Sequence, residues 1–362
     1  MIFVNYGKNF VQATYELLEA SDIKDYLKPE MSVSIKPNLV VARPPNEGAT
    51  THPEVVEGII KFLQDFGVKD IQIIESSSVG QSTMNAFRLA GYFPLEKKYG
   101  VPLIDLKDTP TRLLRFSALD TEVQICERAL DTDFFINVPV LKAHSQTLFT
   151  CCMKNLKGCI PEAEMKRFHT IGLHRPIAAL NALLPVHYNV VDGICGDLSF
   201  EEGGTPLETN RLLCGRDALE LDTYCCGLIG CTPKEVGYLL FGKEYGMGTP
   251  YDEETTKIVE LNAENKPTVP QTTARLADKY RQGYSSIEED QACSVCYAAL
   301  IHALNRSGKG TNREFCVGQG FKGKKEGKGG SMSVGIGACT SGFPAHVKGC
   351  PPKAVDILEF LK

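Results

Sequence analysis

Apolar positions in the first 245 residues fall into two alternating patterns, short runs and longer stretches with helical spacing. Residues 31–36, 68–75 and 133–138 are short apolar runs of the kind that form buried strands. Residues 53–66 repeat apolar side chains at helical spacing, with a proline in the first turn and a glycine after the last residue. This alternation predicts an α/β fold with a mostly parallel sheet and helices on both faces.

The pattern changes after residue 245. Residues 246–284 are polar and contain prolines, which favours a linker or a weakly structured lobe. Residues 285–362 are rich in cysteine and glycine and resemble a metal-binding cassette more than a layer of a sheet. We therefore expect an α/β domain over residues 1–245, a linker or lobe over 246–284, and a cluster-binding cassette over 285–362.

Four cysteines of the cassette have the spacing of a metal-binding set. Cys293 and Cys296 form a C-x2-C pair, and Cys339 and Cys350 follow among glycines and prolines. Four thiolates can close a tetrahedral site or hold one cubane iron–sulfur cluster. Residues 297–306 have helical spacing, so the first pair would lie at a helix N-terminus, where free N–H groups favour anionic sulfur. These features favour a [4Fe-4S] cluster, and zinc held by the same ligands is the alternative.

The chain contains 14 cysteines, which is many for its 362 residues. Thiols stay reduced in the cytosol, so metal or redox chemistry is favoured over a disulfide framework. Eight further cysteines match no ligand spacing, and most are expected to be small buried apolar side chains. A second metal site stays open for this set: Cys151, Cys152, Cys159, Cys195, Cys214, Cys225, Cys226 and Cys231.

Polar residues follow the predicted strands, at the end of a parallel sheet where ligands bind. The candidates for binding a carboxylate or phosphate are cations and amides near these ends, namely Lys36, Asn38, Lys154, Asn155 and Lys157. The candidates for proton transfer are Lys142, His144 and His52. For each of them the alternative is a solvated lysine or a structural histidine.

Composition and charge argue against several classes of protein. A net charge of −5 argues against a general nucleic-acid binder. No apolar run approaches the roughly 20 residues that a membrane span requires. The first residues are strand-like and lack a signal-peptide pattern, so we expect a cytoplasmic protein. Whether the chain forms a homo-oligomer stays open.

Four short motifs give the chain a resemblance to a known family: K-P-N at 36–38, T-H-P at 51–53, N-V-P-x-L-K-x-H at 137–144 and K-N-L-K-G at 154–158. Together they resemble a domain-of-unknown-function family whose members are commonly described as iron–sulfur cluster-binding proteins. The resemblance covers about residues 30–245. Many members carry a ferredoxin insert with closely spaced C-x2-C-x2-C motifs, which this chain lacks. The family therefore implies a cluster but no established reaction.

Two weaker resemblances concern the parts of the chain separately. The late Gly-Cys-Pro-Pro at 349–352 is similar to the cluster-binding end of some small redox subunits. The first domain is distantly similar in style to nickel-pincer lactate racemases.

The leading expectation is an iron–sulfur redox protein that passes electrons to or from an anionic substrate, a cofactor or a partner protein. One alternative is a non-redox isomerase or lyase with a structural cluster or zinc. Another is a cluster-bearing binding or maturation module without turnover. Whether the protein is an enzyme, as an oxidoreductase would be, stays open at this point.

Overall fold

The structure is a computed structural model that describes residues 1–198, 203–204, 206–267, 286–307, 313–330 and 332–361. Its main part is built on an eight-stranded sheet with the strand order β12-β1-β11-β10-β7-β2-β3-β4. The pairs are parallel except where β11 lies antiparallel to β1 and β10. The strands are β1 (Ile2–Asn5), β2 (Ser32–Pro37), β3 (Asp70–Glu75), β4 (Leu103–Asp105), β7 (Phe134–Val138), β10 (Tyr188–Asp197), β11 (Pro206–Gly215) and β12 (Ile258–Leu261).

Helices cover both faces of this sheet, because successive side chains of its buried strands enter two separate cores. In β7, Phe134 and Ile136 pack into one core and Phe135 into the other. The first core is covered by α1 (Phe10–Ala20), α2 (Pro53–Phe66), α3 (Thr83–Leu89) and α4 (Phe93–Tyr99). The second is covered by α6 (Cys152–Asn155), α7 (Glu162–Thr170), α8 (His174–Leu183), α9 (Ala218–Leu228) and α10 (Gly237–Glu244). The predicted mostly parallel α/β fold is confirmed.

Two short hairpins and one short helix complete the main part. The first hairpin pairs β5 (Thr111–Phe116) with β6 (Thr121–Cys126), and α5 (Glu127–Leu130) follows it. The second pairs β8 (Lys142–His144) with β9 (Leu148–Thr150), beyond the carboxyl end of β7. None of the helices that the structure describes combines the length and the apolar character needed to cross a membrane.

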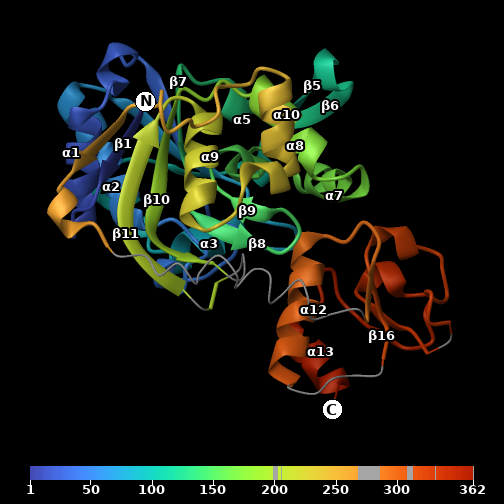
Figure 1. The fold of residues 1–362 in the computed structure, drawn as a ribbon. Coiled ribbons are helices and arrows are strands. Elements are labelled where there is room, and N and C mark those ends of the chain that lie inside the picture. Colours follow the sequence, from blue (N-terminus) through green and yellow to red (C-terminus); the bar gives the residue numbers. More distant parts are fainter. Residues whose placement is uncertain (199–202, 205, 268–285, 308–312, 331, 362) are drawn as a thin grey trace.

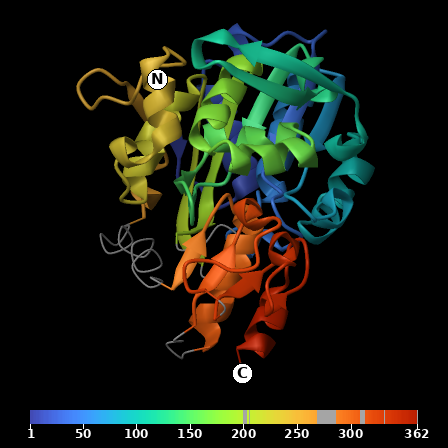
Figure 2. The ribbon, with the colours of Figure 1, turned by 90° about the vertical axis from the view of Figure 1, so that its right-hand side faces the viewer.

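The C-terminal residues form a second, smaller unit at one end of the main part (Figures 1 and 2). Its four strands pair in parallel in the order β13 (Ile287–Glu289), β14 (Phe315–Val317), β15 (Val334–Ile336) and β16 (His346–Val347). The helices α12 (Ser294–Ser307) and α13 (Ala354–Phe360) pack on this sheet around a core of their own. The cysteine-rich segment is thus organised by a small parallel sheet, which its glycine content had hidden.

The second unit contacts the main part through polar side chains near β8 and α7. Gln146, in the β8–β9 turn, donates to the carbonyl of Ala292 (2.9 Å) and accepts from the hydroxyl of Ser294 (2.6 Å). Gln319 donates to the carbonyl of Lys166 in α7 (2.9 Å). These bonds join the start of α12 to the carboxyl-end side of the main sheet.

The stretch expected to be a linker or lobe, residues 246–284, contributes a strand to the main sheet. Within it, β12 pairs in parallel with β1. Ile258 and Val259 lie opposite the apolar Ile2 and Phe3, so this short run pairs with β1 at the edge of the sheet. The sequence alone did not show that this edge was available for pairing. Residues 268–285 of the stretch lie outside the described part of the chain.

Candidate functional site

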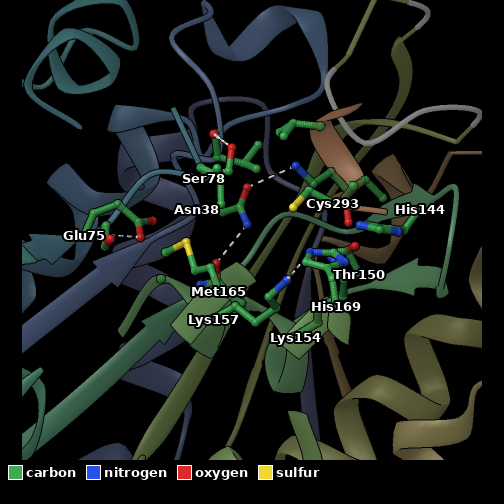
Figure 3. Close-up of a pocket in the computed structure, with 18 of the residues that line it drawn as sticks. Asn38, Glu75, Ser78, His144, Thr150, Lys154, Lys157, Met165, His169 and Cys293 are labelled. Carbon is green, nitrogen blue, oxygen red and sulfur yellow. Dashed lines mark hydrogen bonds between the residues drawn. The ribbon is translucent and has the colours of Figure 1, made fainter. Parts of the chain in front are cut away.

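A cavity of about 90 Å³ lies beyond the carboxyl ends of β2 and β3 (Figure 3). We call it the lysine cavity, after the four lysines in its lining. Ligands of parallel sheets bind at this edge. The cavity brings together seven residues that were singled out from the sequence: Lys36, Asn38, Lys142, His144, Lys154, Asn155 and Lys157.

A buried ion pair forms one wall of the lysine cavity. Lys36 Nζ, at the end of β2, lies 3.0 Å from Glu75 Oε2, at the end of β3, and both side chains are almost fully buried. The same carboxylate oxygen accepts the backbone N–H of Leu39 (2.9 Å). Burial raises the pKa of Glu75, whereas the charge of Lys36 and the N–H of Leu39 act in the opposite direction. The pair therefore fixes the two strand ends relative to each other.

Lys142 is held by a chain of amide side chains. Its ammonium group donates to Asn38 Oδ1 (3.1 Å) and to the carbonyl of Ala49 (2.6 Å). Asn38 in turn donates to Asn155 Oδ1 (2.8 Å), and Asn155 donates to Asn137 Oδ1 (2.8 Å). Each amide orients the next, so the charge of Lys142 has a fixed place in the lining.

His144 faces the cavity from β8 as a neutral imidazole. Its Nδ1 accepts the backbone N–H groups of Gln146 (3.1 Å) and Thr147 (3.3 Å). Burial lowers the pKa of His144 well below its usual value, and the charges of Lys154 and Lys157 lower it further. A neutral ring that accepts at Nδ1 carries its proton on Nε2, so Nε2–H is the group that His144 can use for proton transfer.

Lys154 and Lys157 reach the cavity from the chain that follows β9. Lys154 lies in α6, and Lys157 lies in the 3-10 turn Leu156–Cys159. Lys157 Nζ lies 3.4 Å from Nε2 of His169 in α7, which also lines the cavity. The two lysines therefore add positive charge to the lining of the cavity.

His52, expected as a catalytic residue, is not among the described residues that line the lysine cavity. It lies directly before α2, and its Nδ1 lies 2.9 Å from Asp192 Oδ2. The backbone N–H of His52 donates to the same oxygen (2.8 Å). These bonds tie the start of α2 to β10, which is a structural arrangement.

A second hollow, of about 400 Å³, is lined by Cys293, Cys296, Cys339 and Cys350, and we call it the cysteine hollow. It lies mainly in the C-terminal unit, and Lys166 of α7 completes its lining. Cys293 directly precedes α12, and Cys296 lies in its first turn. Cys339 lies in the 3-10 turn Ala338–Thr340, and Cys350 follows β16. The structure thus brings all four predicted metal ligands around one space.

Glycines shape the wall of the cysteine hollow. Gly318 has a φ of +129°, and a Cβ there would lie 1.9 Å from the carbonyl oxygen of Asp290. Gly349 has a φ of +121° and would clash with the backbone of Pro352. Only glycine fits such positions at low cost. The chain can therefore fold closely around the hollow and turn Cys350 toward it.

Positive charge surrounds the thiols. Lys166 and Lys322 line the cysteine hollow, and Gln319 points its amide toward Cys293 Sγ (3.9 Å). The pKa of Cys293 is lowered to about 7, mainly by a hydrogen bond from Cys296 and further by the charges of nearby lysines. These surroundings favour the thiolate form of Cys293, the form that binds metal. The hydrogen bond with Cys293 raises the pKa of Cys296, and burial raises the pKa of Cys339.

The hollow is wider than a zinc site requires. In a tetrahedral site with Zn–S distances of about 2.3 Å, neighbouring sulfurs lie roughly 3.8 Å apart. Within the described part of the chain, only Cys151, Cys152 and Asp222 bring three ligand atoms within 4.8 Å of one another. No three of the four cysteines of the hollow therefore lie as close together as zinc ligands do, although Cys293 and Cys296 are hydrogen-bonded to each other.

The group of Cys151, Cys152 and Asp222 lies in the main part, fully buried beside α6. Its atoms are close enough to hold a metal ion. Asp222 accepts the backbone N–H groups of Cys152 (2.6 Å) and Met153 (2.9 Å), so it also caps α6. Burial raises the pKa of Asp222 to about 7. The protein thus contains one compact cysteine–aspartate group besides the cysteine hollow.

Two polar residues of the lysine cavity, Thr150 and His169, were not selected as site residues from the sequence, although His169 was one of four histidines that could serve as acid, base or ligand. Thr150 ends β9, and His169 lies in α7. Neither follows a strand of the main sheet, which was the signal used to find the others. The K-N-L-K-G motif at 154–158 lies between them in the chain and was the only local indication of this region.

Comparisons with known proteins find similar chains but give no reaction. A thylakoid-associated protein of Synechocystis sp. is 26% identical over 242 residues, which are 64% of this chain and 73% of that protein. The lactate racemase apoprotein of Thermoanaerobacterium thermosaccharolyticum has a TM-score of 0.43 at 12% identity. A structural-genomics protein of Thermotoga maritima has a TM-score of 0.35 at 13% identity.

The coverage of the solved structures is partial. The match to the lactate racemase apoprotein covers 63% of this chain and 57% of the other. The match to the Thermotoga maritima protein covers 50% of this chain and 49% of the other. The family match is more specific, because it spans residues 33–227, from β2 to α9, and so includes most of the lysine cavity. This chain belongs to the family defined by the domain of unknown function DUF362.

Proposed function

We propose that this protein is an iron–sulfur redox protein that exchanges electrons with a small anion held in the lysine cavity. Cys293, Cys296, Cys339 and Cys350 would hold a [4Fe-4S] cluster. The observation that carries the proposal is the position of Cys293, which lines both the cysteine hollow and the lysine cavity. A group bound by this cysteine lies next to whatever the lysines bind.

The residues around the hollow suit a cluster. Four thiolates supply its ligands, and Lys166 and Lys322 offset its negative charge. The amide of Gln319 is directed at Cys293 Sγ, and hydrogen bonds to sulfur tune the reduction potential of such groups. The wide spacing of the cysteines favours a cluster over a single zinc ion.

When bound, the cluster would supply one-electron transfer. The other steps belong to the protein: Lys154 and Lys157 bind the anion, and His144 moves a proton through Nε2–H. Val79 and Met165 exclude water on the apolar part of the lining. A one-electron carrier protein would deliver or remove each electron on the open side of the hollow, where Cys350 is exposed. The electron count then balances without a further reagent.

The test begins with protein purified without oxygen. We expect about four irons and four acid-labile sulfides per chain, with an EPR signal after dithionite reduction. Cys339→Ala and Cys350→Ala should lose iron and colour. Cys316→Ala is the matched control, because Cys316 lies in the same unit but does not line the hollow. An unchanged iron content in the Cys350→Ala variant would contradict the cluster assignment. One zinc per chain without sulfide in the parent protein would contradict it as well.

A second candidate is a proton-transfer enzyme without redox chemistry, and the fixed tautomer of His144 favours it. In that case turnover would not change when the cysteine hollow is oxidised or reduced, whereas His144→Gln would abolish it. Dependence of turnover on the redox state decides between the two candidates.

A further inference from the structure

Most of the buried polar atoms that lack a hydrogen-bond partner line the lysine cavity. In the described part of the chain, four buried side-chain polar atoms make no hydrogen bond: Ser76 Oγ, Thr150 Oγ1, His169 Nδ1 and Ser333 Oγ. The first three all line the lysine cavity, and their side chains are at least nine-tenths buried. Buried polar groups normally form hydrogen bonds, and a buried group left without a partner costs about 1–3 kcal/mol of folding free energy. Three such groups around one space indicate a site built for a ligand.

His169 presents a hydrogen-bond donor to the cavity. Lys157 Nζ lies 3.4 Å from His169 Nε2, and an ammonium group can only donate, so Nε2 accepts. Burial, followed by the charges of Lys157 and Lys154, lowers the pKa of His169 well below its usual value, with a smaller opposing effect from the Ala292 carbonyl. The ring is therefore neutral, with its proton on Nδ1. Among the described residues Nδ1 has no partner at normal hydrogen-bond distance, and the Ala292 carbonyl has only the small effect on the pKa of the ring.

Most other polar groups in the lining are also donors. His144 carries its proton on Nε2, and the hydroxyls of Ser76 and Thr150 can both donate. The lysines are donors only. A ligand that matches this lining must consist mainly of acceptors, which excludes amines and favours an oxyanion.

The charge of the lining also favours an oxyanion as the ligand. It contains four lysines and one carboxylate, which gives 4 − 1 = +3, with both histidines neutral. Glu75 is engaged by Lys36. Lys142, Lys154 and Lys157 add three further cations to the lining. A lining with this many cationic donors suits an oxyanion.

Size and shape narrow the ligand further. A cavity of about 90 Å³ equals roughly three water molecules at their share of liquid volume, ~30 Å³ each, so a group of a few heavy atoms fits. The donors come from four separate elements: the end of β3 for Ser76, β9 for Thr150, the turn 156–159 for Lys157, and α7 for His169. Donors that surround a small space suit a tetrahedral acceptor better than a planar one.

We propose that the lysine cavity is a phosphoryl-binding site, in which Ser76, Thr150, His169 and Lys157 hold the oxygens of a phosphate group. This inference deepens the proposed function, because it names the anion that faces Cys293 as a small phosphorylated compound held by its phosphoryl group. It rests on the proposed function only for the redox role, in which the rest of that compound, and not the phosphoryl group, would exchange the electron. Binding itself requires no cluster.

The experiment is calorimetric titration of the full-length protein with inorganic phosphate, with acetate at equal ionic strength as the comparison anion. Ser76→Ala and Ser333→Ala form a matched pair, since both remove a buried hydroxyl without a partner but only Ser76 lines the cavity. We expect Ser76→Ala to weaken phosphate binding about tenfold, as loss of one charge-assisted hydrogen bond does. Ser333→Ala should leave the affinity unchanged.

Thr150→Val keeps the shape of the side chain and gives an independent reading if Ser76→Ala fails to fold. It should also weaken phosphate binding about tenfold while the acetate affinity stays low. Phosphate that binds no tighter than acetate overturns the inference, and so does equal weakening by Ser76→Ala and Ser333→Ala.

Iron and sulfide are measured on the same samples. Phosphate binding without a cluster refutes the proposed redox function but leaves the phosphoryl site intact. A full cluster without phosphate binding refutes only the phosphoryl site. The two failures are therefore distinguishable in one set of preparations.

Discussion

Cys293 separates two spaces that are held in shape by different forces. Around the lysine cavity, ion pairs and amide chains such as Lys36–Glu75 and Asn38–Asn155 fix the lining before any ligand arrives. Around the cysteine hollow, backbone conformation sets the shape, and Cys350 is exposed. The lysine cavity is preorganised by charge, whereas the four cysteines of the hollow would be joined only by the proposed cluster. Substitutions in the two regions should therefore act on different properties.

The largest effect on stability should come from breaking the buried ion pair. Lys36→Met leaves the carboxylate of Glu75 buried without its cation, which costs about 3–5 kcal/mol in the free energy of unfolding. Urea denaturation measures it. Lys98→Met is the matched control, because the Lys98–Glu57 pair is largely exposed on the lysine side and its loss should leave the midpoint nearly unchanged. Equal midpoints for the two variants would contradict the view that charge organises the cavity.

A smaller effect is expected from the wall of the hollow. Gly318→Ala forces a side chain onto a positive φ and against the Asp290 carbonyl, and should cost about 2 kcal/mol or more. Gly323→Ala also introduces a positive-φ alanine, but it meets open space. The difference between the two unfolding free energies therefore measures the clash alone. If both variants lose the same stability, close packing of the backbone does not shape the hollow.

The dependence of stability on pH should report on His52. Burial lowers the pKa of His52, but the charge and hydrogen bond of Asp192 outweigh it and raise the pKa overall. A raised folded pKa means stability that is complete below the unfolded value of about 6.5 and lost as pH rises through the folded value. Chemical denaturation between pH 6 and 9 should show this loss, and His52→Gln should flatten it. An unchanged slope in that variant would assign the titration to another group.

The smallest effect on stability should come from Cys350. Because its side chain is exposed and follows a short strand, Cys350→Ala should leave the thermal midpoint of metal-free protein unchanged. The same change should lower the midpoint of protein loaded with metal, since a bound ligand stabilises only the state that binds it. A midpoint that falls equally in both forms would mean that Cys350 supports the fold rather than a ligand.

Much of the main sheet could be predicted because its elements have strong periodicity. The helix expected over residues 53–66 is α2, and the strands expected over 31–36 and 68–75 correspond to β2 and β3. In contrast, no strand was predicted where β11 lies. Its first half alternates exposed and partly buried polar residues, and only pairing with β10 makes it a strand. Edge and hairpin strands gain their stability from tertiary contacts that no local pattern records.

The site was predictable to the extent that it follows strand ends. Lys36, Asn38 and Lys142 were found because parallel strands end at a common edge. His169 was considered but not ranked with them, since α7 reaches the cavity only through the packing of the second core. The shared position of Cys293 was equally hidden, because nothing in the spacing of cysteines says which surface of the main part the C-terminal unit meets.

The family match ends at residue 227, well before Cys293, yet Cys293 to Val295 complete the lining of the lysine cavity. The binding site and the group that would act on its ligand therefore belong to separable modules of one chain. Such an arrangement permits exchange: a different C-terminal module could bring another reactive group to the same anion without remodelling the pocket. For protein engineering, the start of α12 is the position at which a different C-terminal unit could be joined to the lysine cavity.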